Sequence, residues 1–100
     1  MKNNSLLNFS EKYVDDICLV IIGNNKSVFI LKDKTIQTRK LSKKNVVELF
    51  NENENYIKIN SDTIINTTYF IDIISKKDRT ILMKTGNILK VSRKGWTYFK

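Results

Sequence analysis

The sequence contains no histidine, no proline and a single cysteine. The absence of histidine excludes serine–histidine–aspartate and cysteine–histidine catalytic sites, and it excludes every imidazole metal site. One cysteine forms no internal disulfide and no thiolate zinc site. Because Cys18 lies inside an apolar run, we expect it to be a small buried hydrophobic residue in a reducing compartment. We therefore predict that the chain is not an enzyme and that it holds neither a metal nor a cofactor.

Long apolar runs are also absent. The longest run covers residues 17–22, whereas a helix needs roughly 20 apolar residues to cross a bilayer. Near the N-terminus, Leu6, Leu7 and Phe9 are too few to form the apolar core of a signal peptide. We therefore expect a cytoplasmic protein. Its length of 100 residues predicts one domain, residues 1–100, with a single core.

The positive charge of the chain is concentrated at its C-terminal end. Residues 76–100 carry eight basic side chains and one acidic side chain, a net charge of +7, whereas residues 1–75 carry ten and nine, a net charge of +1. Such a concentration attracts a polyanion and releases its counterions on contact. Trp96, Tyr98 and Phe99 are interleaved with these bases, which indicates a structured element. The charge favours nucleic-acid binding, whereas a low-G+C genome would enrich lysine without that function.

Short apolar stretches of period two predict a mostly β fold. We expect about eight strands, at residues 17–22, 27–31, 35–39, 56–59, 63–66, 70–74, 79–84 and 88–91. The period changes once, after Ser42, which can cap a helix with an apolar stripe at Val46, Leu49 and Phe50. Gly86 and Asn87 tolerate positive φ and predict a tight turn before the last of these strands. Residues 93–99 form either a helical turn or a final strand.

Two segments of the chain resemble sequence motifs of a known protein family. Residues 56–66 read YIKINSDTIIN, and residues 86–94 read GNILKVSRK, a glycine turn followed by an aliphatic strand and Ser-Arg. Together they resemble the central signature and the closing hairpin of the LytTR (LytR/AlgR-type) DNA-binding domain. The resemblance spans roughly Tyr13 to Lys100. It departs from the family pattern at Asn60-Ser61-Asp62, where His-Arg-Ser or His-Asn-Ser is usual, and at Thr63, where an aromatic residue is usual.

The resemblance implies a fold, a function and a set of partners. The fold is an elongated β-sandwich of three small antiparallel sheets with one helix. The function is sequence-specific binding of double-stranded DNA by a bacterial transcription regulator, through loops that enter the major groove. The chain resembles a free-standing regulator without a receiver domain, of the kind paired with a separate inhibitor protein in the membrane or the cytoplasm. No heptad or long apolar stripe is available for dimerisation, so we expect a monomer in solution that occupies DNA repeats in pairs.

Three loops carry the DNA contacts in this family, and they map to residues 24–27, 60–62 and 92–94. The DNA-binding residues expected in them are Asn24, Asn25, Lys26, Ser27, Asn60, Ser61, Arg93 and Lys94. Arg93 offers the planar fork that reads guanine O6 and N7, and it could also be an ordinary solvated arginine. The phosphate-binding residues expected are Lys76, Lys77, Arg79, Lys90 and Lys94. Asn24 and Asn25 also fit a plain hairpin turn, and Asp62 either repels DNA, pairs with a lysine or caps the following turn.

Two alternatives from other classes remain open from the sequence. One is a protein-interaction module derived from a LytTR domain that has lost operator binding through Asn60-Ser61-Asp62. The other is a small basic β-barrel that binds RNA, with bases stacked on Trp96, Tyr98 and Phe99. For Trp96 and Phe99 we favour packing in the core.

Overall fold

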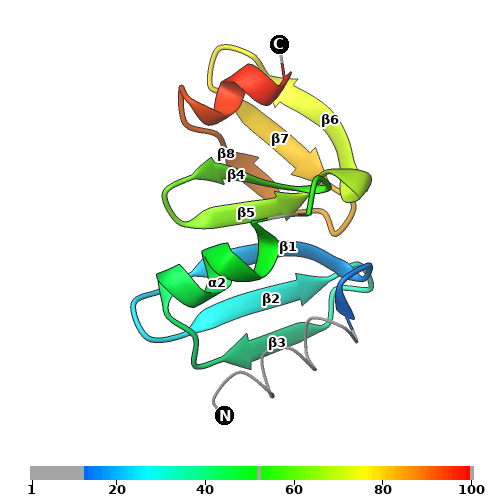
Figure 1. The fold of residues 1–100 in the computed structure, drawn as a ribbon. Coiled ribbons are helices and arrows are strands. Elements are labelled where there is room, and N and C mark those ends of the chain that lie inside the picture. Colours follow the sequence, from blue (N-terminus) through cyan, green and yellow to red (C-terminus); the bar gives the residue numbers. More distant parts are fainter. Residues whose placement is uncertain (1–12, 52, 100) are drawn as a thin grey trace.

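The computed structural model describes residues 13–51 and 53–99, which form two antiparallel sheets and helix α2 (Figure 1). Residues 1–12, over which we expect no signal-peptide core, lie outside the described part, as does Lys100. The strands are β1 (Ile17–Ile22), β2 (Ser27–Leu31), β3 (Ile36–Arg39), β4 (Tyr56–Asn60), β5 (Thr63–Asn66), β6 (Phe70–Ser75), β7 (Thr80–Met83) and β8 (Ile88–Lys90). The helices are α2 (Lys43–Phe50) and the 3-10 helices η1 (Thr67–Tyr69) and η2 (Gly95–Phe99). The predicted mostly β fold is confirmed, and none of the described helices is long and apolar enough to cross a membrane.

The strands form two sheets, so the expectation of three small sheets is wrong. One sheet has five strands in the order β3-β2-β1-β5-β4, and the other has three in the order β6-β7-β8. The physical reason is that β1 pairs on both of its edges. Val20 lies opposite Phe29 of β2 on one side and opposite Ile64 of β5 on the other. This double pairing joins the N-terminal strands and the β4–β5 hairpin into one sheet.

The hydrophobic core lies on both faces of the five-stranded sheet. On one face, Val46 and Phe50 of α2 pack with Val20 of β1 and its neighbours. On the other face, Ile81 and Met83 of β7 pack with Leu19 of β1. A strand that is covered on both faces needs apolar side chains on both, which explains the apolar residues from Ile17 to Val20, all fully buried, whereas Ile21 is exposed. The layers give the molecule an elongated shape, 45 × 25 × 22 Å (Figure 1).

The local signals for the helix and for the last hairpin are both realised. Ser42 is the N-cap of α2, and its side chain accepts a hydrogen bond from the backbone N–H of Asn45 at 3.3 Å. Gly86 has a φ of +89°, which favours glycine, and its N–H donates to the carbonyl of Met83 at 2.8 Å. Of the two possibilities for residues 93–99, the structure has the helical one, because η2 covers Gly95–Phe99.

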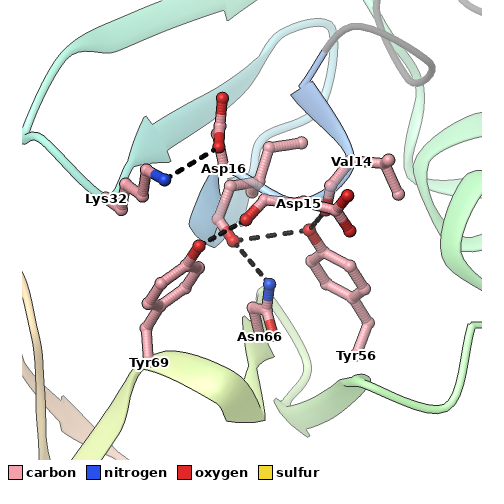
Figure 2. A network of polar contacts seen from close by, with 8 residues as sticks. Val14, Asp15, Asp16, Lys32, Tyr56, Asn66 and Tyr69 are labelled. Atoms are coloured by element: carbon pink, nitrogen blue, oxygen red, sulfur yellow. Dashed lines mark hydrogen bonds and ion pairs between the residues drawn. The ribbon is translucent and has the colours of Figure 1, made fainter.

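Two tyrosines hold the segment that leads into β1 (Figure 2). The hydroxyl of Tyr56 donates to the carbonyl of Val14 and lies 3.3 Å from that of Ile17. The hydroxyl of Tyr69 donates to the carbonyl of Asp15. Burial raises the pKa of Tyr56 well above that of a free phenol, so Tyr56 remains a proton donor. These bonds tie β4 and η1 to the start of the strand on which the larger sheet depends.

Asn66 and Lys32 complete this network from two further elements. The side-chain amide of Asn66 donates to the carbonyl of Ile17 at 3.0 Å. The ammonium group of Lys32 forms an ion pair with Asp16 at 3.2 Å. Because both side chains of the pair are partly exposed, water screens their attraction and the pair adds little to the free energy of unfolding. The buried hydrogen bonds therefore contribute more to this junction than the ion pair does.

We predict that Tyr56→Phe lowers the free energy of unfolding by about 1–2 kcal/mol, because it leaves a partly buried carbonyl of Val14 without its donor. Tyr98→Phe is the matched control, since the Tyr98 ring is exposed, and it should change stability by less than about 0.5 kcal/mol. Urea unfolding followed by circular dichroism measures both. Equal effects of the two substitutions would show that the network around Val14 adds nothing to stability.

Candidate nucleic-acid interface

Three connecting segments meet along one edge of the molecule, at the left in Figure 1. They are the β1–β2 turn, the β4–β5 turn and the segment between β8 and η2. The middle segment touches both others: the N–H of Ile22 donates to the carbonyl of Asp62 at 2.7 Å, and the N–H of Ser92 donates to the carbonyl of Ile59 at 2.8 Å. Backbone hydrogen bonds thus hold the three segments side by side. We call this edge the loop edge.

The β1–β2 turn presents three of the four residues expected to contact DNA. Asn24, Asn25 and Lys26 are exposed, and the turn is closed by a hydrogen bond from the N–H of Gly23 to the carbonyl of Lys26 at 2.8 Å. Ser27 is different, because it is fully buried and its hydroxyl donates to the carbonyl of Leu41 at 3.3 Å. Ser27 therefore fixes the turn from below and offers no atom at the surface.

In the β4–β5 turn, Asn60 holds the backbone in place. Its side-chain amide nitrogen donates to the carbonyl of Lys90 at 2.7 Å, and its side-chain oxygen accepts from the N–H of Asp62 at 2.9 Å. Both polar groups of Asn60 are thus already used within the protein. Ser61 and Asp62 are exposed. Within the described part of the chain, the carboxylate of Asp62 forms no ion pair and caps no backbone N–H, so it is an exposed negative charge on the loop edge.

The segment between β8 and η2 presents Arg93 and Lys94. Both are exposed, and they lie between Ser92 and Gly95, which are held in place by contacts within the protein. Ser92 caps η2, because its hydroxyl accepts from the N–H of Gly95 at 3.0 Å and its carbonyl accepts from the N–H of Trp96 at 2.9 Å. Gly95 lies so close to β4 that a Cβ atom there would be 2.5 Å from the carbonyl oxygen of Ile59. Glycine is therefore required for η2 to approach the β4–β5 hairpin.

The other predicted phosphate contacts lie further from this edge. Lys76 and Lys77 are exposed on the β6–β7 turn, at the upper end of the molecule in Figure 1. Arg79 is half-buried, and its Nε donates to the carbonyl of Val91 at 3.0 Å. Arg79 therefore ties this turn to the segment that carries Arg93. Lys90 is exposed at the end of β8.

Two further lysines at the loop edge were not predicted as DNA contacts. Lys43 and Lys44 are exposed in the first turn of α2. The cap signal at Ser42 could have located them, because it marks the start of the helix.

The aromatic residues near the C-terminus divide into two groups. Trp96 and Phe99 pack together with a ring separation of 5.6 Å, and Phe99 also packs on Phe70 at 5.2 Å. Both join the core cluster beneath the three-stranded sheet, as favoured from the sequence. Tyr98 is 63% exposed. Of the three rings that the RNA-binding alternative requires at the surface, only Tyr98 is exposed, whereas Trp96 and Phe99 are partly buried.

Acidic side chains gather at the opposite ends of the strands. Asp15 and Asp16 precede β1, and Asp33 follows β2, which pairs with β1 so that Leu31 lies opposite Ile17. Glu48 and Glu54 line a hollow of about 680 Å³ between the end of α2 and the start of β4. Lys32 and Lys34 lie in the same turn as Asp33 and offset part of this negative charge, whereas on the loop edge the basic side chains outnumber Asp62. In the field of a polyanion, this difference in charge would turn the loop edge toward it.

We predict that Asn60 acts by positioning the loop edge. Asn60→Ala removes both hydrogen bonds and should lower the free energy of unfolding by about 1–2 kcal/mol, with faster amide exchange at Asp62. Asn60→Asp keeps the acceptor for the N–H of Asp62 and replaces the donor to Lys90 with a second, negatively charged acceptor. Its Asp62 amide should therefore stay protected in hydrogen exchange followed by NMR. Equal exchange rates for Asp62 in the two variants would contradict this role.

Comparison with known proteins identifies the fold. The sequence matches no protein-family model, and no curated protein matches it significantly. Among solved structures, the chain is similar to the LytTr DNA-binding domain of a protein described as a methyl-accepting/DNA response regulator from Bacillus cereus. The TM-score is 0.66 at 19% sequence identity, and the match covers 84% of this chain and 77% of that one. The resemblance found in residues 56–66 and 86–94 is thus supported by the three-dimensional arrangement: the chain has the fold of a LytTR domain.

Proposed function

We propose that this protein binds double-stranded DNA through the loop edge and acts as a transcription regulator. The observation that carries the proposal is the convergence of three segments far apart in the sequence, which together present exposed Asn, Lys, Ser and Arg side chains at one end of the strands. The excess of basic side chains on the loop edge makes this the edge that a polyanion approaches. A solved domain of the same fold carries the description of a DNA-binding domain.

The exposed residues divide into two roles in this proposal. Arg93, on a segment held at both ends, reads a guanine in the major groove through its O6 and N7 atoms. Asn24 and Asn25 are placed to contact base edges or phosphates, and Lys26, Lys94 and the lysines of the β6–β7 turn bind phosphates and fix the register. Asn60 and Ser27 support the edge from within. The carboxylate of Asp62 repels the phosphates of the DNA backbone and lowers the affinity, because salt screens this repulsion only partly.

The same proposal extends to the setting in which the protein works. We place it in the cytoplasm of a bacterium, as a monomer that occupies repeated sites in pairs on one face of the duplex, about 34–36 Å apart. Its activity would be controlled by a separate inhibitor protein, in the membrane or the cytoplasm. Binding rather than catalysis is the role that the exposed groups support.

Duplex binding should depend steeply on salt. We expect a log–log slope of about −4 to −7 against salt concentration, which corresponds to roughly five to eight neutralised phosphates. Fluorescence anisotropy with a labelled duplex and with the single strand of the same sequence measures it. Tighter binding to the single strand would support the RNA-binding alternative. No binding to either at low salt would support the protein-interaction module.

Base reading and phosphate binding should separate by mutation. Arg93→Ala should weaken binding to a site selected from random duplexes by about 1–3 kcal/mol and remove discrimination at one base pair. Lys77→Ala should weaken all duplexes alike and make the salt slope shallower by about one. Both side chains are exposed, so neither substitution should alter stability. If the two variants lose affinity in the same way on selected and random duplexes, Arg93 does not read sequence.

A further inference from the structure

A hollow of about 330 Å³ lies beside the loop edge, between the β4–β5 hairpin and η2. Lys58 and Ser61 line it from the hairpin, and Lys94 and Tyr98 line it from the segment around η2. Ser61 and Lys94, one on each wall, belong to two of the three segments that form the loop edge. The N–H of Ser92 donates a hydrogen bond to the carbonyl of Ile59, which joins the two walls. Gly95 packs against Ile59 and allows the walls to lie close together. The hollow is thus built before any ligand arrives.

The groups that line this hollow suit an anion. The side chains of Lys58, Lys94 and Tyr98 are exposed and carry hydrogen-bond donors, and the hydroxyl of Ser61 is a fourth donor. No acidic side chain is among the described residues that line it. The hollow between the end of α2 and the start of β4 differs in this respect, because the acidic residues Glu48 and Glu54 line it.

Tyr98 adds an apolar surface to these charges. Its neighbours Trp96 and Phe99 are packed inward, whereas its own ring is 63% exposed. The ring also borders a second, mostly apolar hollow with Ile57, Ile73 and Phe99. An exposed aromatic ring with an apolar face and a polar tip is typical of binding surfaces that are apolar at one end and wet at the other. A phosphate joined to a sugar has this combination of charge and apolar surface.

We propose that the hollow seats a phosphodiester group of the bound duplex between Lys58 and Lys94, with the ring of Tyr98 against the adjoining deoxyribose. Lys58 and Tyr98 thereby join the DNA interface, although neither belongs to the three loops that the family resemblance indicates. The inference rests on the proposed function, because it assumes that the loop edge faces DNA. Beyond the proposed function, the path of the DNA backbone is specified: it passes between the β4–β5 turn and the segment carrying Arg93.

The first test compares two exposed lysines. Lys58→Ala should weaken duplex binding roughly five- to tenfold near 0.1 M salt and make the salt slope shallower by about one. Lys84→Ala is the matched control, since Lys84 is also exposed but follows β7, at the end of the three-stranded sheet away from the loop edge in Figure 1. It should leave the affinity within about twofold and the slope unchanged. If wild-type protein binds DNA and the two variants behave alike, the hollow holds no phosphate. If wild-type protein does not bind DNA, it is the proposed function that fails.

The second test uses Tyr98. Tyr98→Ala should weaken binding about threefold or more without changing the salt slope, because no charge is lost, and Tyr98→Phe should retain most of the affinity through the ring. Unchanged binding by Tyr98→Ala would overturn the sugar contact. A titration with a deoxynucleoside 5′-monophosphate separates the two sources of phosphate. Displacement of the duplex by submillimolar nucleotide would show a small-ligand site, contrary to the proposal.

Discussion

The double pairing of β1 determines how the rest of the structure is arranged. Because β1 bonds to β2 on one edge and to β5 on the other, the β1–β2 turn and the β4–β5 turn end up at the same end of one sheet. Both faces of β1 are covered, one by α2 and the other by the three-stranded sheet. The segment after β8 then reaches the same edge through the contact of Ser92 and Gly95 with Ile59. Without this strand the three loops would not share an edge.

The network at the other end of β1 supports the same arrangement. Tyr56 and Asn66, from the two strands of the β4–β5 hairpin, both reach the carbonyl of Ile17 at the start of β1 (Figure 2). The hairpin is therefore fixed to β1 at both ends, by side chains near Ile17 and by the backbone bond from Ile22 to Asp62. This rigidity explains how a loop edge without a recognition helix presents side chains in a fixed geometry. Preorganised contacts bind with a smaller loss of conformational entropy.

Much of the fold could be predicted from the sequence because its signals are local. The run at residues 17–22, the cap at Ser42 and the glycine turn at Gly86 each specify their own element. The number of sheets could not be predicted in this way, since it depends on which edge of β1 a distant hairpin pairs with. The same limit applies to side chains. Ser27 and Asn60 are polar residues at strand ends next to turns, and only their hydrogen bonds to the carbonyls of Leu41 and Lys90 show that they support the loop edge. Lys58 lies within the segment that resembles the family signature, but only the packing of η2 beside it shows that it lines a hollow.

The central claim is that the loop edge is the surface that meets DNA. The most direct measurement is NMR chemical-shift mapping of ¹⁵N-labelled protein titrated with a short duplex at low salt. The account predicts that the largest shifts fall on the amides of Asn24 to Lys26, Ser61 to Asp62 and Arg93 to Lys94, with small changes at Asp15 and Glu48. Shifts centred instead on the outer face of the three-stranded sheet, where Ile71, Ile74 and Ile88 are exposed, would contradict it.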